Sequence, residues 1–82
     1  MFHKVQDVKP LADLNLLVCF MNDEVKRYDV KPLLREWEPF RSLDTIPGLF
    51  ERVCVDIGGY GVIWDDHIDL SCNELYNNGI SV

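Results

Sequence analysis

Short stretches of this chain alternate between apolar and polar residues, which is the period-two pattern of β-strands with one buried face. The clearest stretch is residues 14–20. Its alternate positions form an apolar face: Leu14, Leu16, Val18 and Phe20. The opposite face is partly apolar as well, so we expect this strand to be central in its sheet. Residues 5–11 mix β-branched and charged residues and include Pro10, which favours an edge strand.

Turn signals indicate how the strands are connected. Asn22-Asp23 separates residues 14–20 from the more polar residues 24–30. Asn and Asp tolerate the positive φ that a tight hairpin turn requires. We therefore expect a β-hairpin in the first half of the chain.

A second group of strands is predicted in the C-terminal half. Residues 53–57 alternate in polarity and run into the glycine-rich residues 58–61. Residues 62–64 are too few for a helix, and Asp65-Asp66 reverses the chain before residues 68–70. These segments predict an antiparallel meander.

Two short helical segments are expected between the groups of strands. Pro32 suits the first turn of a helix in residues 31–37, where a missing N–H costs nothing. Asp44 or Thr45 is placed to cap a single helical turn that continues through residues 47–50.

The last helix is the best marked. Ser71 and Glu74 have the spacing of a capping box, and Asn78-Gly79 is a stop signal. The whole pattern predicts an α+β fold: a small curved antiparallel sheet of about five to six short strands with two or three short helices, the last at the C-terminus. Residues 1–82 are too few for a second domain, so we expect one.

Composition narrows the classes of protein. Hydrophobic residues make up 48% of the chain, which supports a packed core, but so small a domain buries only about 60% of its unfolded surface. Self-association, such as a homodimer, would cover more. Fourteen acidic residues against eight scattered basic ones give a net charge of −6, which disfavours nucleic acid as a partner.

The three cysteines are Cys19, Cys54 and Cys72, with no Cys-x-x-Cys spacing. An odd number without that spacing predicts neither a disulfide framework nor a zinc ribbon, and it fits a reducing, cytoplasmic location. No signal peptide or membrane span is indicated, since the longest apolar run has six residues, 16–21. Cys19 and Cys54 are expected to be buried in strands, and Cys72 in a helix's first turn is the thiol to test for reactivity.

Polar groups and glycines gather in residues 58–69. Gly58, Gly59 and Gly61 invite comparison with phosphate-binding loops, but a strand follows them instead of a helix and no Lys is near. We interpret them as a tight turn. The side chains of Asp65, Asp66 and His67 could supply metal ligands, although their spacing matches no EF-hand loop. A solvated turn is the simpler interpretation.

Aromatic residues make up 11% of the chain, more than a small core readily hides. Because aromatic side chains dominate binding hot spots, we expect some of them at a protein interface. At least Trp37 or Tyr60 is predicted to be there. The full set of candidate interface residues is Trp37, Phe40, Tyr60 and Trp64.

Several motifs together resemble the small bacterial domain of unknown function 2442 family over nearly the whole chain. The motifs are the Asn22-Asp23 hairpin, the run Val30-Lys31-Pro32-Leu33-Leu34, the glycine turn and strand of residues 58–64, and Asp69-Leu70-Ser71 with Glu74-Leu75-Tyr76. The resemblance implies an α+β fold with no assigned reaction or catalytic residues. It also implies a gene beside that of another small protein, in arrangements suggestive of toxin and antitoxin pairs. Some members of the family continue into a C-terminal helix-turn-helix, and none is seen here before Val82.

Three functional hypotheses follow. The leading one is a non-enzymatic module that binds another protein, such as the product of a neighbouring gene, and acts like an antitoxin. The second is a small-molecule or metal-binding enzyme that uses the Gly58 to Asp69 region, which would require Asp56, Asp66 and His67 to converge. The third, a domain that regulates transcription, is disfavoured by charge and by the missing helix-turn-helix. No motif implies a cofactor, and no membrane partner is expected.

Overall fold

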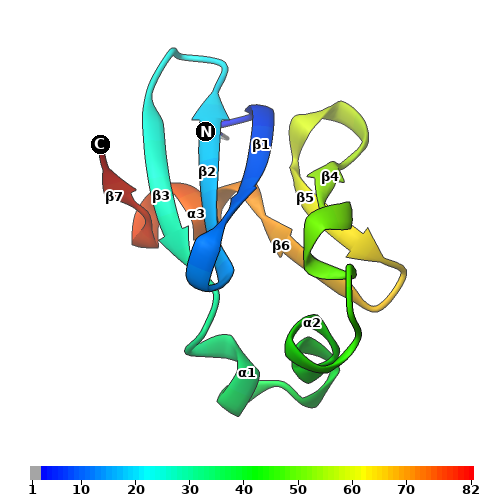
Figure 1. The fold of residues 1–82 in the computed structure, drawn as a ribbon. Coiled ribbons are helices and arrows are strands. Elements are labelled where there is room, and N and C mark those ends of the chain that lie inside the picture. Colours follow the sequence, from blue (N-terminus) through cyan, green and yellow to red (C-terminus); the bar gives the residue numbers. More distant parts are fainter. Residues whose placement is uncertain (1–2) are drawn as a thin grey trace.

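The computed structural model describes residues 3–82, which form two antiparallel sheets and several short helices (Figure 1). The first sheet has the strand order β1-β2-β3-β7 and the second the order β4-β5-β6. The α+β class is therefore confirmed, with the strands divided between two sheets. The strands are β1 (Val5–Leu11), β2 (Asn15–Phe20), β3 (Val25–Asp29), β4 (Cys54–Val55), β5 (Gly61–Asp65), β6 (Ile68–Ser71) and β7 (Ile80–Ser81).

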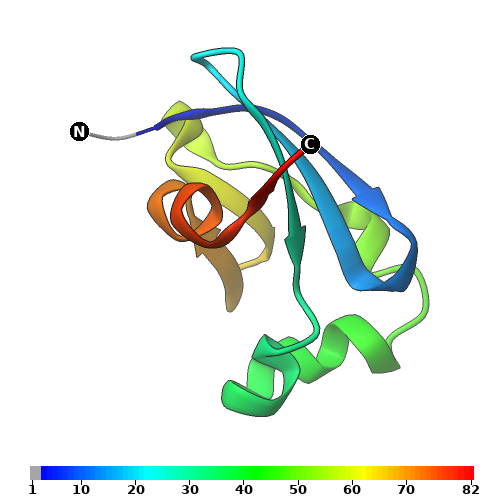
Figure 2. The same cartoon turned by 90° about the vertical axis from the view of Figure 1, so that its left-hand side faces the viewer.

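The helices cover one end of the sheets and one face. In Figure 1, α1 and α2 lie below the two sheets, and α3 lies behind β2 and β3. Figure 2 shows that α3 and the second sheet are on the same side of the first sheet. The α-helices are α1 (Leu33–Glu36), α2 (Ser42–Thr45) and α3 (Cys72–Asn78), and the 3-10 turns are η1 (Ala12–Leu14), η2 (Glu38–Arg41), η3 (Phe50–Arg52) and η4 (Ile57–Gly59).

The predicted hairpin is confirmed. β2 is central, with β1 at the edge of the sheet, and Leu16, Val18 and Phe20 are fully buried. Asp23 has φ of 71°, and the Asn22 side-chain oxygen accepts a hydrogen bond from the Glu24 N–H at 3.1 Å. A side-chain turn of this kind favours the tight reversal between β2 and β3.

The core lies between the first sheet, the second sheet and α3. Residues 33–52, which contain α1, η2, α2 and η3 and are called the helical segment below, close one end. Trp64 of β5 joins this segment to the second sheet. Its indole N–H donates to the Phe50 carbonyl at 3.0 Å, and its ring centroid lies 6.1 Å from that of Phe40. The buried hydrophobic residues are Val5, Val8, Leu16, Val18, Phe20, Tyr28, Val30, Leu33, Phe40, Leu43, Phe50, Val62, Trp64, Ile68, Leu70, Cys72 and Leu75.

The helical turn expected after Asp44 or Thr45 is wrong. Both residues lie inside α2, which ends at Thr45, and the next helical turn begins only at Phe50. The break has a local cause. Ile46 is extended (φ −95°, ψ 113°), because a residue that precedes a proline is disfavoured in the helical region.

The strand predicted for residues 53–57 is shorter than expected. β4 contains only Cys54 and Val55, and Ile57 leaves the sheet at the start of η4. The Asp56 carboxylate accepts from the Ile57 N–H at 2.7 Å, and the Asp56 carbonyl accepts from the Gly59 N–H at 3.0 Å. These local bonds begin a turn where the polarity pattern suggested a strand.

The capping signal at the last helix is confirmed. The Ser71 hydroxyl accepts from the Glu74 N–H at 3.1 Å. The Glu74 carboxylate accepts instead from the Tyr28 hydroxyl at 2.7 Å, so it ties α3 to β3. After Gly79, the chain adds β7 to β3, a two-residue strand that the sequence did not predict.

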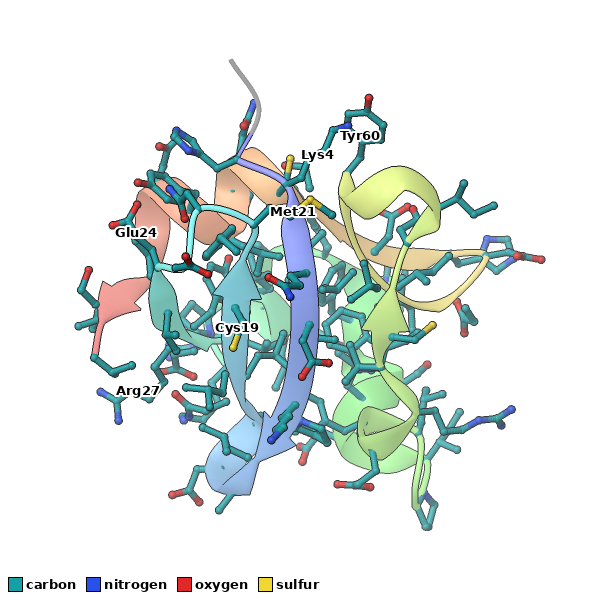
Figure 3. All side chains as sticks on the ribbon, turned by 90° about the horizontal axis from the view of Figure 1, so that it is seen from above. Lys4, Cys19, Met21, Glu24, Arg27 and Tyr60 are labelled. Atoms are coloured by element: carbon teal, nitrogen blue, oxygen red, sulfur yellow. The ribbon has the colours of Figure 1, made fainter. Side chains whose placement is uncertain are left out.

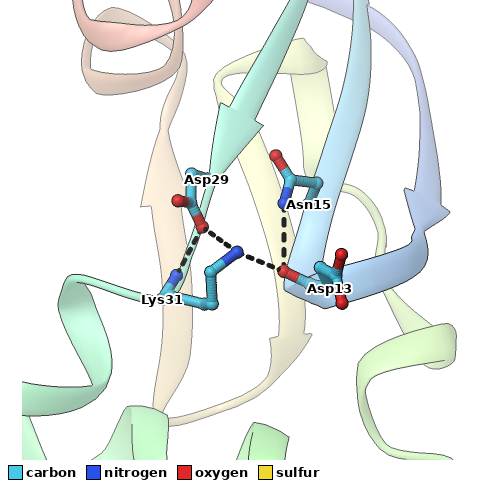
Figure 4. A network of polar contacts seen from close by, with 4 residues as sticks. All are labelled: Asp13, Asn15, Asp29 and Lys31. Carbon is cyan, nitrogen blue, oxygen red and sulfur yellow. Dashed lines mark hydrogen bonds and ion pairs between the residues drawn. The ribbon is translucent and has the colours of Figure 1, made fainter.

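A polar network fixes the end of β3 to the turn between β1 and β2 (Figure 4). The Lys31 ammonium donates to the Asp13 carbonyl at 2.7 Å and contacts the Asp29 carboxylate at 3.0 Å, and Asn15 also donates to that carbonyl. Partial burial opposes ionisation of Asp29, but the hydrogen bonds and charge of Lys31 hold its pKa below the ordinary value. The network supports Asp13 at φ 61°, in the left-handed region.

We predict that Gly61→Ala destabilises the protein far more than Gly48→Ala. A Cβ at Gly61 would overlap the Leu70 carbonyl oxygen of β6, whereas one at Gly48 meets nothing within 4 Å and is strained only by its φ of 81°. We expect a loss of about 1–2 kcal/mol for Gly48→Ala and about 3 kcal/mol for Gly61→Ala. Urea unfolding measures both, and equal losses would contradict the close approach of β5 to β6.

Candidate functional site

The candidate glycines form a tight turn between β4 and β5. Gly58 and Gly59 have φ of 78° and 80°, a region that L side chains rarely adopt. A Cβ at Gly59 would lie 2.8 Å from the Val5 carbonyl oxygen, so the loop packs directly on the start of β1. Gly58 and Gly59 therefore form the turn that the sequence indicated, whereas Gly61 is the first residue of β5.

Exposed apolar side chains surround this turn. Ile57 is 92% exposed and Tyr60 is 49% exposed. The Lys4 ammonium lies 4.9 Å from the Tyr60 ring centroid, and the Met21 N–H donates to the Lys4 carbonyl at 2.8 Å. Figure 3 shows Lys4, Met21 and Tyr60 in one neighbourhood. We call Lys4, Met21, Ile57 and Tyr60 the glycine-loop surface.

The four candidate interface aromatics separate into two groups. Phe40 and Trp64 are 3% and 7% exposed, so their assignment to an interface is wrong in this fold and they belong to the core. The periodicity of the sequence could not show that the helical segment, which includes Phe40, packs against Trp64 of β5. Trp37 and Tyr60 are exposed. Trp37 follows α1 and Ile46 follows α2, and these two helices lie at the opposite end from the β4–β5 turn in Figure 1.

The three side chains that the second hypothesis requires, those of Asp56, Asp66 and His67, do not converge. The Asp65 carboxylate accepts from the His67 N–H at 2.8 Å, so Asp65, Asp66 and His67 make an exposed turn at one end of β5. Asp56 lies at the other end, where its N–H donates to the Gly61 carbonyl at 2.9 Å. The intervening strand keeps them about 13 Å apart. Among residues 3–82, no three His, Cys, Asp or Glu side chains are grouped to hold a metal ion.

The exposures of the cysteines differ from the expectation that Cys54 is buried and from the expectation that Cys72 is a candidate reactive thiol. Cys54 is exposed, because it lies on the outer face of β4, while Val53 and Val55 are turned toward the core. Cys72, singled out for a reactivity test, is buried, and Cys19 is half-buried. Burial restricts access to Cys72, so its place in the first turn of α3 does not make it a reactive thiol.

A groove of about 290 Å³ lies between β3, α1, α3 and β7, and no motif in the sequence indicated it. Glu74 stands on one wall, where its Oε2 accepts from the Tyr28 hydroxyl at 2.7 Å and from the Asn78 amide at 2.9 Å. Burial first, and then the hydrogen bond and charge of Glu74, raise the pKa of Tyr28. The lining residues are Arg27, Tyr28, Asp29, Pro32, Leu33, Glu36, Glu74, Asn78 and Ile80.

The fold and its surfaces define a small α+β domain with two antiparallel sheets, an exposed glycine loop and an edge groove. The chain belongs to the family described as protein of unknown function (DUF2442), whose model matches residues 5–81. The resemblance inferred from the motifs is thus confirmed. Searches of the curated proteins and of the solved structures found no match. Within residues 3–82, no helix has the length and apolar character needed to span a membrane.

We predict that ionisation of Tyr28 weakens the fold at high pH. Because its pKa is raised in the folded state, its stabilising contribution is present below the unfolded value of about 10 and is lost as pH rises toward the folded value. The unfolding free energy should therefore fall more steeply above pH of about 10 in the native protein than in Tyr28→Phe. Urea unfolding at increasing pH tests this, and parallel curves would contradict it.

Proposed function

We propose that this protein is a non-enzymatic module that binds another protein through the glycine-loop surface. The observation that supports the proposal best is the exposure of Ile57 and Tyr60 on a turn whose conformation requires glycine. A side chain held in place before binding loses little freedom on binding, and this raises affinity. Tyrosine side chains such as Tyr60 are enriched among the residues that carry most of the binding energy at interface centres.

The arrangement around Tyr60 favours recognition over a purely structural role. A Cβ at Gly58 would lie 2.8 Å from the Tyr60 ring, so the ring rests on the glycine with the Lys4 ammonium beside it. An apolar ring next to a cation can contact both an apolar side chain and a carboxylate of a partner. Ile57 contributes almost nothing to the core of the described residues, and water is an unfavourable environment for it.

The finer role that we propose is antitoxin-like. Its support is the family resemblance, which implies a gene beside that of another small protein, in arrangements suggestive of toxin and antitoxin pairs. In this role, the protein would bind the product of the neighbouring gene in the cytoplasm and neutralise it. Binding and neutralisation require no catalytic group in this chain.

We predict that Tyr60→Ala and Ile57→Ser each reduce co-purification of the partner with the tagged full chain by about tenfold, because large side chains at interface centres carry much of the binding energy. The measurement is quantitative mass spectrometry of what the tagged protein retains from native cells. Trp37→Ala and Ile46→Ser are the matched controls, since they truncate exposed apolar side chains at the opposite end. Losses confined to the two controls would overturn the assignment of the surface.

The antitoxin-like role has its own test. Expression of the neighbouring gene product alone should slow growth, and co-expression of this protein should restore it. Tyr60→Ala should restore growth less well than Trp37→Ala at equal protein levels, because only the former alters the glycine-loop surface. Growth that stays slow in the presence of the unaltered protein would exclude neutralisation, while leaving binding to be judged by co-purification.

A further inference from the structure

We propose that the groove between β3, α1, α3 and β7 binds a short extended segment of a partner protein, with a Lys or Arg side chain of that segment between Glu36 and Glu74. This groove shares no residue with the glycine-loop surface. Its lining residues come from β3, α1, α3 and β7, whose ribbons are seen in Figure 2. The two surfaces can therefore be tested separately.

The first support is an open sheet edge. The Val30 N–H donates to the Leu14 carbonyl at 3.0 Å, on the β2 side, and backbone groups alternate sides along an antiparallel strand. The N–H and C=O of Asp29 therefore face the β7 side. β7 begins opposite Arg27 and runs from there toward Val25, so it does not reach Asp29. An incoming extended segment can hydrogen-bond to this edge, as in β-strand addition.

The second support is the shape and apolar floor of the groove. Tyr28 and Leu33 are buried at its base, and Pro32 and Ile80 flank them. A volume of about 290 Å³ is at the lower limit of ligand pockets, which are roughly 300–1,000 Å³. The groove is thus suited to one or two side chains of a peptide and is too small for a nucleotide cofactor.

The third support is charge. The lining residues include Glu36, Glu74 and Asp29 but only Arg27 as a cation. The Asp29 carboxylate is already paired with Lys31 at 3.0 Å, as Figure 4 shows, so Glu36 and Glu74 supply the free negative charge. Burial raises the pKa of Tyr28 most, and the hydrogen bond and charge of Glu74 and the charge of Glu36 raise it further.

Glu74 is also oriented before a ligand arrives. Its hydrogen bonds from Tyr28 and Asn78 both fall on Oε2, so the lone pairs of Oε1 remain for a further donor. A guanidinium or ammonium group above the apolar floor would gain a charge-assisted hydrogen bond there. The net charge of −6 adds a longer-range attraction for a basic segment.

The test begins with a phage library of random seven-residue peptides selected on the immobilised full chain. We expect the selected peptides to share a Lys or Arg flanked by apolar or β-branched residues. The consensus peptide, labelled with a fluorophore, is then titrated against the variants Glu36→Gln, Glu74→Gln and Glu51→Gln. The last is the matched control, because Glu51 is exposed outside the groove and its loss changes the net charge equally.

Glu36→Gln and Glu74→Gln should each weaken binding by about tenfold, and Glu51→Gln by less than about twofold. Glu36 is exposed, so its variant remains informative if Glu74→Gln lowers stability. Selection of no peptide, a consensus without a basic residue, or equal binding by the Glu36→Gln and Glu51→Gln proteins would each overturn the proposal. Tyr60→Ala should bind the peptide normally, so failure here is distinct from failure of the proposed function.

Discussion

Gly59 lies so close to the start of β1 that a Cβ there would come within 2.8 Å of the Val5 carbonyl oxygen. This approach fixes the second sheet against the first. The second sheet needs such support, because β4 has two residues and three short strands are marginal without a packed face. The buried face of β5 then completes a core with β2 and α3, and Trp64 fastens the helical segment to it. The same loop determines where the exposed apolar side chains stand.

Fold and proposed function therefore depend on one backbone constraint. The positive φ of Gly58 and Gly59 reverses the chain between β4 and β5, and this reversal directs Ile57 outward and lays Tyr60 over Gly58. A larger residue at either glycine would disturb the sheet junction and the surface together. The groove beside β3 has a different origin. It exists because β7 begins opposite Arg27 and does not reach Asp29, the last residue of β3.

The elements that could be predicted from the sequence are those whose structure is decided by local chemistry. The apolar face of β2, the Asn22-Asp23 turn and the Ser71 cap follow from side-chain period, tolerated φ and a single hydrogen bond. The elements that were predicted wrongly are those whose structure depends on tertiary contacts or on a competing local hydrogen bond. The Asp56 carboxylate accepts a hydrogen bond from the Ile57 N–H and so begins a turn there. Packing of the helical segment against β5 buries Phe40 and Trp64, although nothing in the sequence distinguishes them from exposed aromatic residues. β7 and the groove carry no signal, because two residues have no periodicity and the lining residues come from four separate elements.

Site-specific photo-crosslinking in native cells tests the central claim, protein binding through the glycine-loop surface, most directly. A photoreactive amino acid replaces Ile57 in one strain and Ile46 in another, since both side chains are exposed and leave the core intact. We expect the probe at position 57 to capture one dominant protein and the probe at position 46 to capture none above background. Capture from position 46 alone, or from neither position, would contradict the account.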